Sequence, residues 1–151
     1  MDTESPIGPL LHSTTAAQLA GMLQAAGCRA SVIDNRGRRE VHSAVQALGF
    51  FLRLGNPQPG SEACIDFTWV CPLAVRGELP RELIESWNRS TRFGHLSLQG
   101  GILVLSMESL LAGGVTEAHL RAQFEIWVRL LQQLHLHVRS HAAQGVQAAA
   151  A

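Results

Sequence analysis

The strongest pattern in this 151-residue chain is a long amphipathic stripe near its C-terminal end. Six apolar residues follow one another at steps of four, three, four, three and four: Leu120, Phe124, Trp127, Leu131, Leu134 and Val138. This spacing places all six on one side of an α-helix, and that side must be buried against another element. Thr116 is a suitable N-cap for the helix, and Glu117 follows it. The chain is therefore expected to fold around one long C-terminal helix.

The same helix carries more apolar residues than one packing surface needs. Ile126, Val128, Leu130 and Leu136 lie outside the stripe, and a helix that covers one face of a sheet needs a single apolar stripe. The surplus indicates either a second packing partner, such as another copy of the chain, or a helix that is buried on several sides. The residues expected at a possible interface are Ile126, Trp127, Leu130 and Leu134.

Two shorter helices are predicted ahead of the long one. Thr14 or Thr15 can cap a helix that stops at Gly27, where a left-handed backbone is favoured. Pro80 suits the first turn of a second helix that runs to about Arg89.

Between these helices, β-rich stretches bounded by turn residues predict about six strands. The expected strands cover residues 28–33, 41–47, 49–54, 63–71, 95–99 and 102–107. Gly100 and Gly101 suit a short hairpin connection. The sequence lacks the strand–helix–strand alternation that would require a parallel sheet. We therefore predict a two-layer α+β fold, with an antiparallel sheet of five to six strands packed by three helices in the order α-β-β-β-β-α-β-β-α.

The two ends of the chain show no periodic pattern. Residues 1–13 are expected to form a flexible leader and residues 142–151 a disordered tail, with a single domain over residues 14–141. The acidic start, Met1 to Glu4, does not resemble a secretory signal, and no apolar run approaches the ~18–20 residues of a membrane span. A cytoplasmic protein with no membrane partner is expected.

Composition excludes several kinds of chemistry. The chain contains no tyrosine, and all 12 of its basic residues are arginine, so it has no Schiff-base or phosphate-loop lysine and no tyrosine acid. Its 12 acidic residues bring the net charge to zero. A neutral chain lacks the basic excess that drives nucleic-acid binding, and weak mutual repulsion favours self-association.

Candidate metal ligands and nucleophiles do not form a recognisable motif. Cys28, Cys64 and Cys71 are widely spaced, without C-x-x-C pairs, and are expected to be inert buried thiols. His137 and His141 share a helix face, but no carboxylate is near them in the sequence, so a surface or interface role is expected. No nucleophile elbow is present. We therefore predict no catalytic residue, no metal and no cofactor.

One corner combines aromatic and cationic residues where the second helix meets the next strand. Trp87 and Asn88 precede Arg92 and Phe93 within the segment WNRSTRFG. An arginine near a helix C-terminus is favoured by the helix dipole, and its planar head can stack on a ring or grip a carboxylate. A structural corner is expected, and ligand binding is the alternative.

The corner and a later turn together resemble a known family. Residues 87–94 resemble the W-N-x-x-x-R-F-G corner of the YbjN family of bacterial sensory transduction regulators, and residues 113–116 resemble its G-G-V-T turn. The similarity spans roughly residues 14–138. The family-typical positions in this chain are Trp87, Asn88, Arg92, Phe93, Gly113 and Gly114.

Two segments depart from the family pattern. Residues 99–101 read QGG where the family commonly has an Asp-rich turn, and residues 110–112 read LLA where it often has acidic residues. Any partner contact that the family makes through those acids is therefore not expected here.

The resemblance implies a fold similar to type III secretion chaperones, often dimeric, with no known enzymatic activity and no cofactor. We expect a non-catalytic protein-binding or regulatory domain that acts through protein–protein contacts, with a second copy and an unidentified protein as partners. A secretion or client-protein chaperone is the alternative, although such chaperones are usually acidic. A small enzyme is the third possibility.

Overall fold

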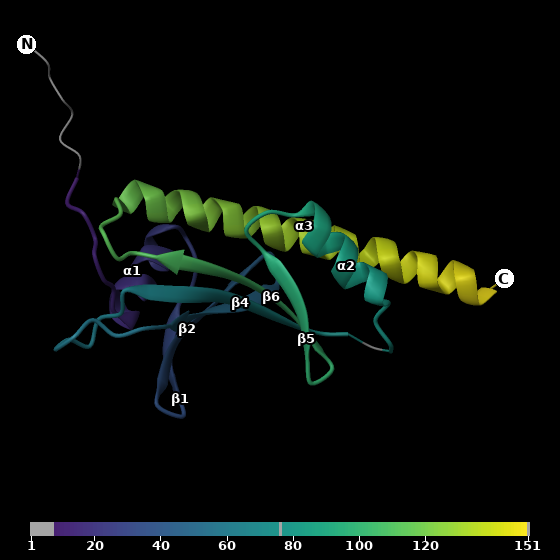
Figure 1. Ribbon diagram of the computed structural model, residues 1–151, viewed down its shortest axis with the longest axis horizontal. Coiled ribbons are helices and arrows are strands. Elements are labelled where there is room, and N and C mark those ends of the chain that lie inside the picture. The colour runs from purple at the N-terminus through teal and green to yellow at the C-terminus, as the bar shows by residue number, and fades with distance from the viewer. Residues whose placement is uncertain (1–7, 76, 151) are drawn as a thin grey trace, which may run out of the picture.

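The computed structural model describes residues 8–75 and 77–150, with side chains up to residue 141. The three helices of this part of the chain are α1 (Ala16–Ala25), α2 (Arg81–Ser90) and α3 (Glu117–Ala150). All three lie on one face of a curved sheet, and α3 runs across the sheet from end to end (Figure 1). None of these helices combines the length and apolar character needed to cross a bilayer.

The sheet has six strands and is antiparallel throughout, in the order β1-β2-β3-β4-β6-β5. The strands are β1 (Ser31–Asn35), β2 (Arg38–Val45), β3 (Leu48–Leu54), β4 (Asp66–Ala74), β5 (His95–Gln99) and β6 (Ile102–Leu110). The predicted class, layer arrangement and order of elements are confirmed.

Local chemistry sets several ends of these elements. Thr15 caps α1: its hydroxyl accepts a hydrogen bond from the Gln18 amide at 3.2 Å, and the Gln18 side chain accepts one from the Thr15 amide at 3.0 Å. Gly27 follows α1 with a φ of +91°. Gly100 and Gly101 both have positive φ, as a two-residue hairpin between β5 and β6 requires.

Strand boundaries were less predictable at β1, β2, β4 and β6. The strand expected at residues 28–33 runs instead from Ser31 to Asn35, because the Cys28 amide still closes the end of α1 by donating to the Leu23 carbonyl at 3.0 Å. The strand expected at residues 41–47 runs from Arg38 to Val45, and the one expected at 102–107 continues to Leu110. The strand expected from residue 63 begins at Asp66. Cys64 makes backbone bridges to Thr14 and Pro57 rather than to a long strand.

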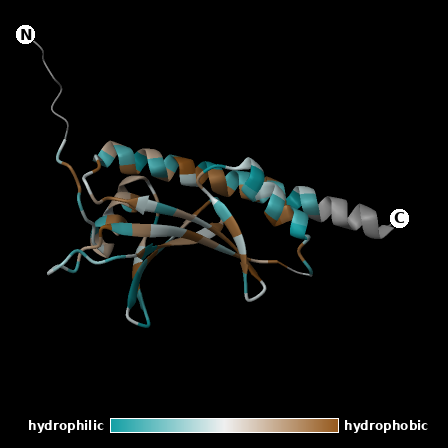
Figure 2. Ribbon diagram, in the orientation of Figure 1, coloured by the Kyte–Doolittle hydropathy of each residue, from teal (hydrophilic) through white to brown (hydrophobic). Residues whose placement is uncertain are grey.

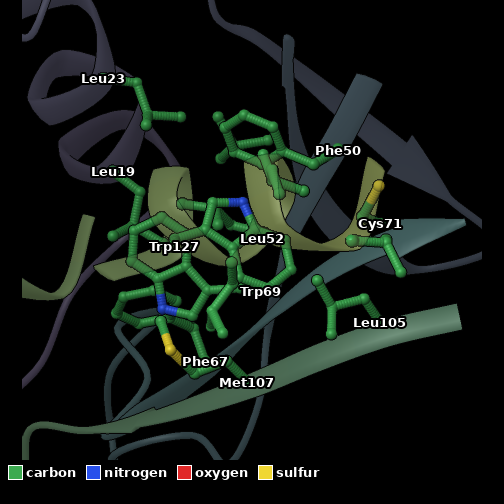
Figure 3. Close-up of a cluster of buried hydrophobic side chains, with 14 of the residues drawn as sticks. Leu19, Leu23, Phe50, Leu52, Phe67, Trp69, Cys71, Leu105, Met107 and Trp127 are labelled. Atoms are coloured by element: carbon green, nitrogen blue, oxygen red, sulfur yellow. The ribbon is translucent and has the colours of Figure 1, made fainter. Parts of the chain in front are cut away.

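The core lies between the sheet and the helices, and three tryptophans are its largest side chains. The rings of Trp69 on β4 and Trp127 on α3 have their centroids 5.8 Å apart, and Phe50 on β3 meets Trp127 edge-on at 5.9 Å (Figure 3). Trp87 on α2 is also buried. Aromatic contacts of this kind stabilise beyond the area they bury.

A buried polar chain fixes α3 on the sheet. The Trp69 indole N–H donates to the Ser109 hydroxyl at 2.8 Å, and that hydroxyl donates to the Gln123 side chain at 2.6 Å. The Ser109 side chain thereby joins β4, β6 and α3. Because hydrogen bonds are directional and apolar packing is not, this link sets the position of α3 along the sheet.

The expected leader and tail overlap the described residues only in part. Residues 1–7 and residue 151 lie outside them. Leu11 exchanges two backbone hydrogen bonds with Val115, at 2.7 and 2.9 Å, so the chain ahead of α1 pairs with the turn before α3. Helix α3 continues to Ala150.

The sheet face opposite the helices carries a buried carboxylate. Glu40 on β2 is only 2% exposed, and it accepts hydrogen bonds from Arg53 and His42, both at 3.1 Å. Burial raises the pKa of the Glu40 carboxyl, but these hydrogen bonds and the Arg53 charge outweigh it and hold the pKa below the ordinary 4.5. Glu40 is therefore an ionised group that fastens β2 to β3.

Replacing Glu40 by glutamine should destabilise the protein in a pH-dependent way. Because the folded pKa is lowered, the carboxylate contributes stability above its ordinary pKa of 4.5 and loses it as the pH falls through the folded value. In urea unfolding, Glu40→Gln should lower the free energy of unfolding by about 1–3 kcal/mol at about pH 5, and this difference should shrink toward about pH 3. Glu108→Gln, an exposed carboxylate on the same sheet, is the control. A pH-independent cost would contradict the ionised role of Glu40.

Candidate functional site: the groove between the corner and helix α3

The corner that follows α2 is built from the end of that helix. α2 buries Leu83 and Trp87 against the core. It ends where the Thr91 amide donates to the Trp87 carbonyl at 2.9 Å and the Thr91 backbone turns to an extended conformation. The next few residues must then reverse direction to enter β5 at His95.

Two family-typical residues hold this reversal in place. The Trp87 indole N–H donates to the Gly94 carbonyl at 3.0 Å. The Asn88 side chain pairs with both backbone groups of Leu96, donating to its carbonyl at 2.9 Å and accepting from its amide at 2.8 Å. Asn88 thus acts as a neighbouring strand would. Trp87 and Asn88 have structural roles.

The other two corner residues, Arg92 and Phe93, are exposed. The Gly94 amide donates to the Arg92 carbonyl at 2.9 Å, which closes a γ-turn around Phe93 with a φ of +72°. A γ-turn with positive φ is rare and strained, most of all for a bulky residue. The Phe93 side chain is nevertheless 60% exposed, so the strain is not compensated by burial of the ring.

Gly94 is a functional position that the sequence pattern did not single out. A Cβ atom there would lie 3.0 Å from a Leu130 methyl carbon and 3.1 Å from a Leu105 methyl carbon. Any larger residue would require these leucine methyl groups to shift, so glycine suits the close approach of the corner backbone to α3. The signal in the sequence was the glycine that ends the WNRSTRFG segment.

A groove of about 570 Å³ separates the corner from α3. The residues around it are Trp87, Ser90, Thr91, Arg92, Phe93, Ile126, Arg129, Leu130, Gln133, Leu136 and His137. Ile126 and Leu130, expected at an interface, therefore lie beside Arg92 and Phe93 of the predicted corner. On α3, Leu136 is 65% exposed. Figure 2 shows how hydrophobic and hydrophilic residues alternate along this helix.

The remaining predicted positions lie elsewhere. Trp127 and Leu134 are 0% exposed and belong to the core of the single chain, so they offer no surface to a partner. Leu130 is also in the core at 4% exposure, which leaves Ile126 as the one predicted interface residue that is only partly buried. Gly113 and Gly114 have φ of +90° and +98° in the turn before α3, far along the chain from the groove. Thr116 caps α3, accepting from the His119 amide at 3.0 Å.

One wall of the groove is braced by a histidine. His137 donates from Nε2 to the Leu83 carbonyl of α2 at 2.8 Å, and its ring meets Trp87 edge-on at 5.5 Å. His141 contacts the carbonyl of His137 at 3.0 Å. Both predicted histidines are engaged in contacts that join α2 to α3 or continue along α3. Within the described residues, no group of three potential ligands is arranged to hold a metal ion.

A wider hollow of about 1100 Å³ lies at the ends of β3, β4 and β6. Charged residues of both signs line it, among them Arg38, Arg53, Asp66 and Glu108. The Asp66 carboxylate accepts two hydrogen bonds from Asn56, at 2.9 and 2.7 Å. Arg53 pairs with Glu40, which lies outside the lining, and Asp66 is held by the turn at Asn56.

Two of the three cysteines, Cys64 and Cys71, are placed as thiols of low reactivity. Cys64 and Cys71 are buried, and Cys28 is partly buried. Burial raises the pKa of the Cys71 thiol to about 11, and burial together with the nearby Asp66 charge raises that of Cys64. A raised pKa lowers the thiolate fraction, which is the reactive form.

The YbjN family, described as "Putative bacterial sensory transduction regulator", matches residues 15–139 of this chain. That match covers most of the chain, including both helices that form the groove, and the chain belongs to this family. No curated protein and no solved structure matches it. The likeness to type III secretion chaperones stays a prediction.

Replacing Phe93 by glycine should stabilise the fold. Glycine adopts a positive φ without strain, and the exposed ring contributes little burial, so relief of strain should exceed the added entropy of the unfolded chain. We expect a gain of about 1 kcal/mol in the free energy of unfolding, measured in urea. The matched control is Gln46→Gly, at another exposed residue with positive φ. A loss of stability in Phe93→Gly alone would show that the ring has a structural role.

Proposed function

We propose that this chain is a non-catalytic regulatory domain that acts by binding another protein through the corner groove. The observation that carries the proposal is Phe93, an aromatic side chain held outside the core by a strained turn. Strain of this kind persists where surrounding structure enforces it, and it clusters at functional positions. Trp87, Asn88 and Gly94 supply that enforcement.

The groove has the make-up of a protein-binding surface. Aromatic residues and arginine are enriched among the residues that dominate binding energy, and here Phe93 lies beside Arg92 and Arg129. Ile126 and Leu136 extend the apolar area along α3. Because the corner backbone is already fixed, little conformational entropy is lost when a partner docks.

A homodimer through the exposed side of α3 is the second part of the proposal. Trp127 and Leu134 are in the core, so a second copy has to use other residues. Arg121 and Glu125 are exposed one helical turn apart, and the small Ala122 beside them lets two helices approach. Antiparallel packing of two copies of α3 sets Arg121 of each against Glu125 of the other. The zero net charge of the chain favours such contact.

Removing the Phe93 ring should abolish partner capture. In a pull-down from native bacterial lysate read by quantitative mass spectrometry, Phe93→Ala should lose at least about tenfold of the specific partner signal, since a buried aromatic anchor is worth 2 kcal/mol or more. Leu110→Ala removes an equally exposed apolar side chain, at 61%, from the end of β6, outside the groove, and should keep the partner. Equal capture by both variants and the unchanged chain would refute the groove as the binding surface.

Reversing one charge on α3 should weaken the dimer. Glu125→Arg would place an arginine opposite Arg121 at both contacts of the dimer, and these like charges repel. The dimer dissociation constant should therefore rise about tenfold, as measured by size-exclusion chromatography with light scattering. The double variant Arg121→Glu/Glu125→Arg restores opposite charges and should recover the dimer. A strict monomer for the unchanged chain at high concentration would remove this part of the proposal.

A further inference from the structure

The groove gathers positive charge without any acid. Arg92 from the corner and Arg129 from α3 both line it, and none of its lining residues is Asp or Glu. Within the described residues, neither arginine takes part in an ion pair, whereas the nearby Arg89 is held by Glu82 at 3.1 Å. The two guanidinium groups are therefore available to an incoming carboxylate.

This local excess stands out because the chain as a whole is neutral, with 12 basic and 12 acidic residues. A two-fold contact between the grooves of two copies would set Arg92 and Arg129 against the same two residues of the other chain. Like charges brought together at an interface cost several kcal/mol. The groove charge therefore disfavours a second copy here and favours a negatively charged partner.

The charges alternate in space with apolar side chains. Phe93 adjoins Arg92 on the corner side, while Ile126 and Leu136 flank Arg129 on α3. A free anion would leave this apolar surface uncovered, and a purely apolar segment would desolvate two arginines without pairing them. A volume of about 570 Å³ suits a few side chains of a short segment rather than a whole domain surface.

We propose that the groove binds a short segment of a partner protein in which one or two carboxylates lie next to a leucine or an aromatic residue. Its carboxylates pair with Arg92 and Arg129, whose planar heads can grip a carboxylate at two points. Its apolar side chain packs on Phe93 and Leu136. This inference rests on the proposed function and specifies the chemistry of the partner.

The test uses the full chain and three fluorescein-labelled peptides of one design. The first combines Leu, Phe and Glu, the second has Gln in place of each Glu, and the third has Lys. In fluorescence anisotropy, the Glu peptide should bind at least about tenfold more tightly than the Gln peptide, and added salt should reduce the difference. The variant Arg92→Glu/Arg129→Glu should lose the Glu peptide and bind the Lys peptide instead.

A control with the same change in net charge separates this site from general attraction. Arg38→Glu/Arg139→Glu reverses two exposed arginines outside the groove and should leave the order of the peptides unchanged. The inference is overturned if the Glu and Gln peptides give equal signals, including no binding by either, or if the control variant loses the Glu peptide equally. If the peptides fail while Phe93→Ala still loses its partner from lysate, the binding function stands and the acidic partner does not.

Discussion

The packing of α3 on the sheet is the contact on which the rest of this structure depends. Trp127 packs against both Phe50 and Trp69, and the hydrogen-bonded chain from Trp69 through Ser109 to Gln123 fixes where along the sheet the helix lies. Aromatic burial supplies most of the energy, since truncating a buried Trp typically costs about 3–5 kcal/mol. The buried hydrogen bonds supply the position, because displacing α3 would separate Gln123 from the buried Ser109 hydroxyl. The indole N–H of Trp127 is buried without a hydrogen-bond partner in the described part of the chain, so this ring contributes through packing alone. A helix fixed in this way can serve as a rigid wall for a binding groove.

The corner facing that wall divides its tasks among neighbouring residues. Trp87, Asn88 and Gly94 hold the backbone against α3, while Arg92 and Phe93 project from it. The γ-turn at Phe93 combines a strained backbone with an exposed aromatic ring, and this combination is the basis of the proposed binding role. This division gives a physical meaning to the corner of the YbjN family in this chain: one half of the motif is scaffold and the other half is surface.

Much of the fold could be predicted because its signals are local. The steps of three and four along α3, the Thr15 cap and the Gly100–Gly101 turn each need only neighbouring residues. The candidate site was predicted only in pieces. The corner and the apolar surplus on α3 were both recognised, but nothing in the sequence says that Phe93 and Ile126 share one groove. The role of Gly94 depends on Leu105 and Leu130, which come from two other elements.

The sequence by itself determined the helices, the antiparallel α+β class, the neutral charge and the corner motif, because periodicity, capping and composition act over a few residues. Only the tertiary structure decided which side of α3 is buried in the core and which side borders the groove. Trp127 and Ile126 are neighbours in the chain and both are apolar, yet one is fully buried and the other borders the groove. The rotation of α3 about its axis determines which of the two residues is buried. Contacts between residues far apart in sequence set this rotation: Ser109, held by Trp69, bonds to Gln123, and Gly94 packs on Leu130.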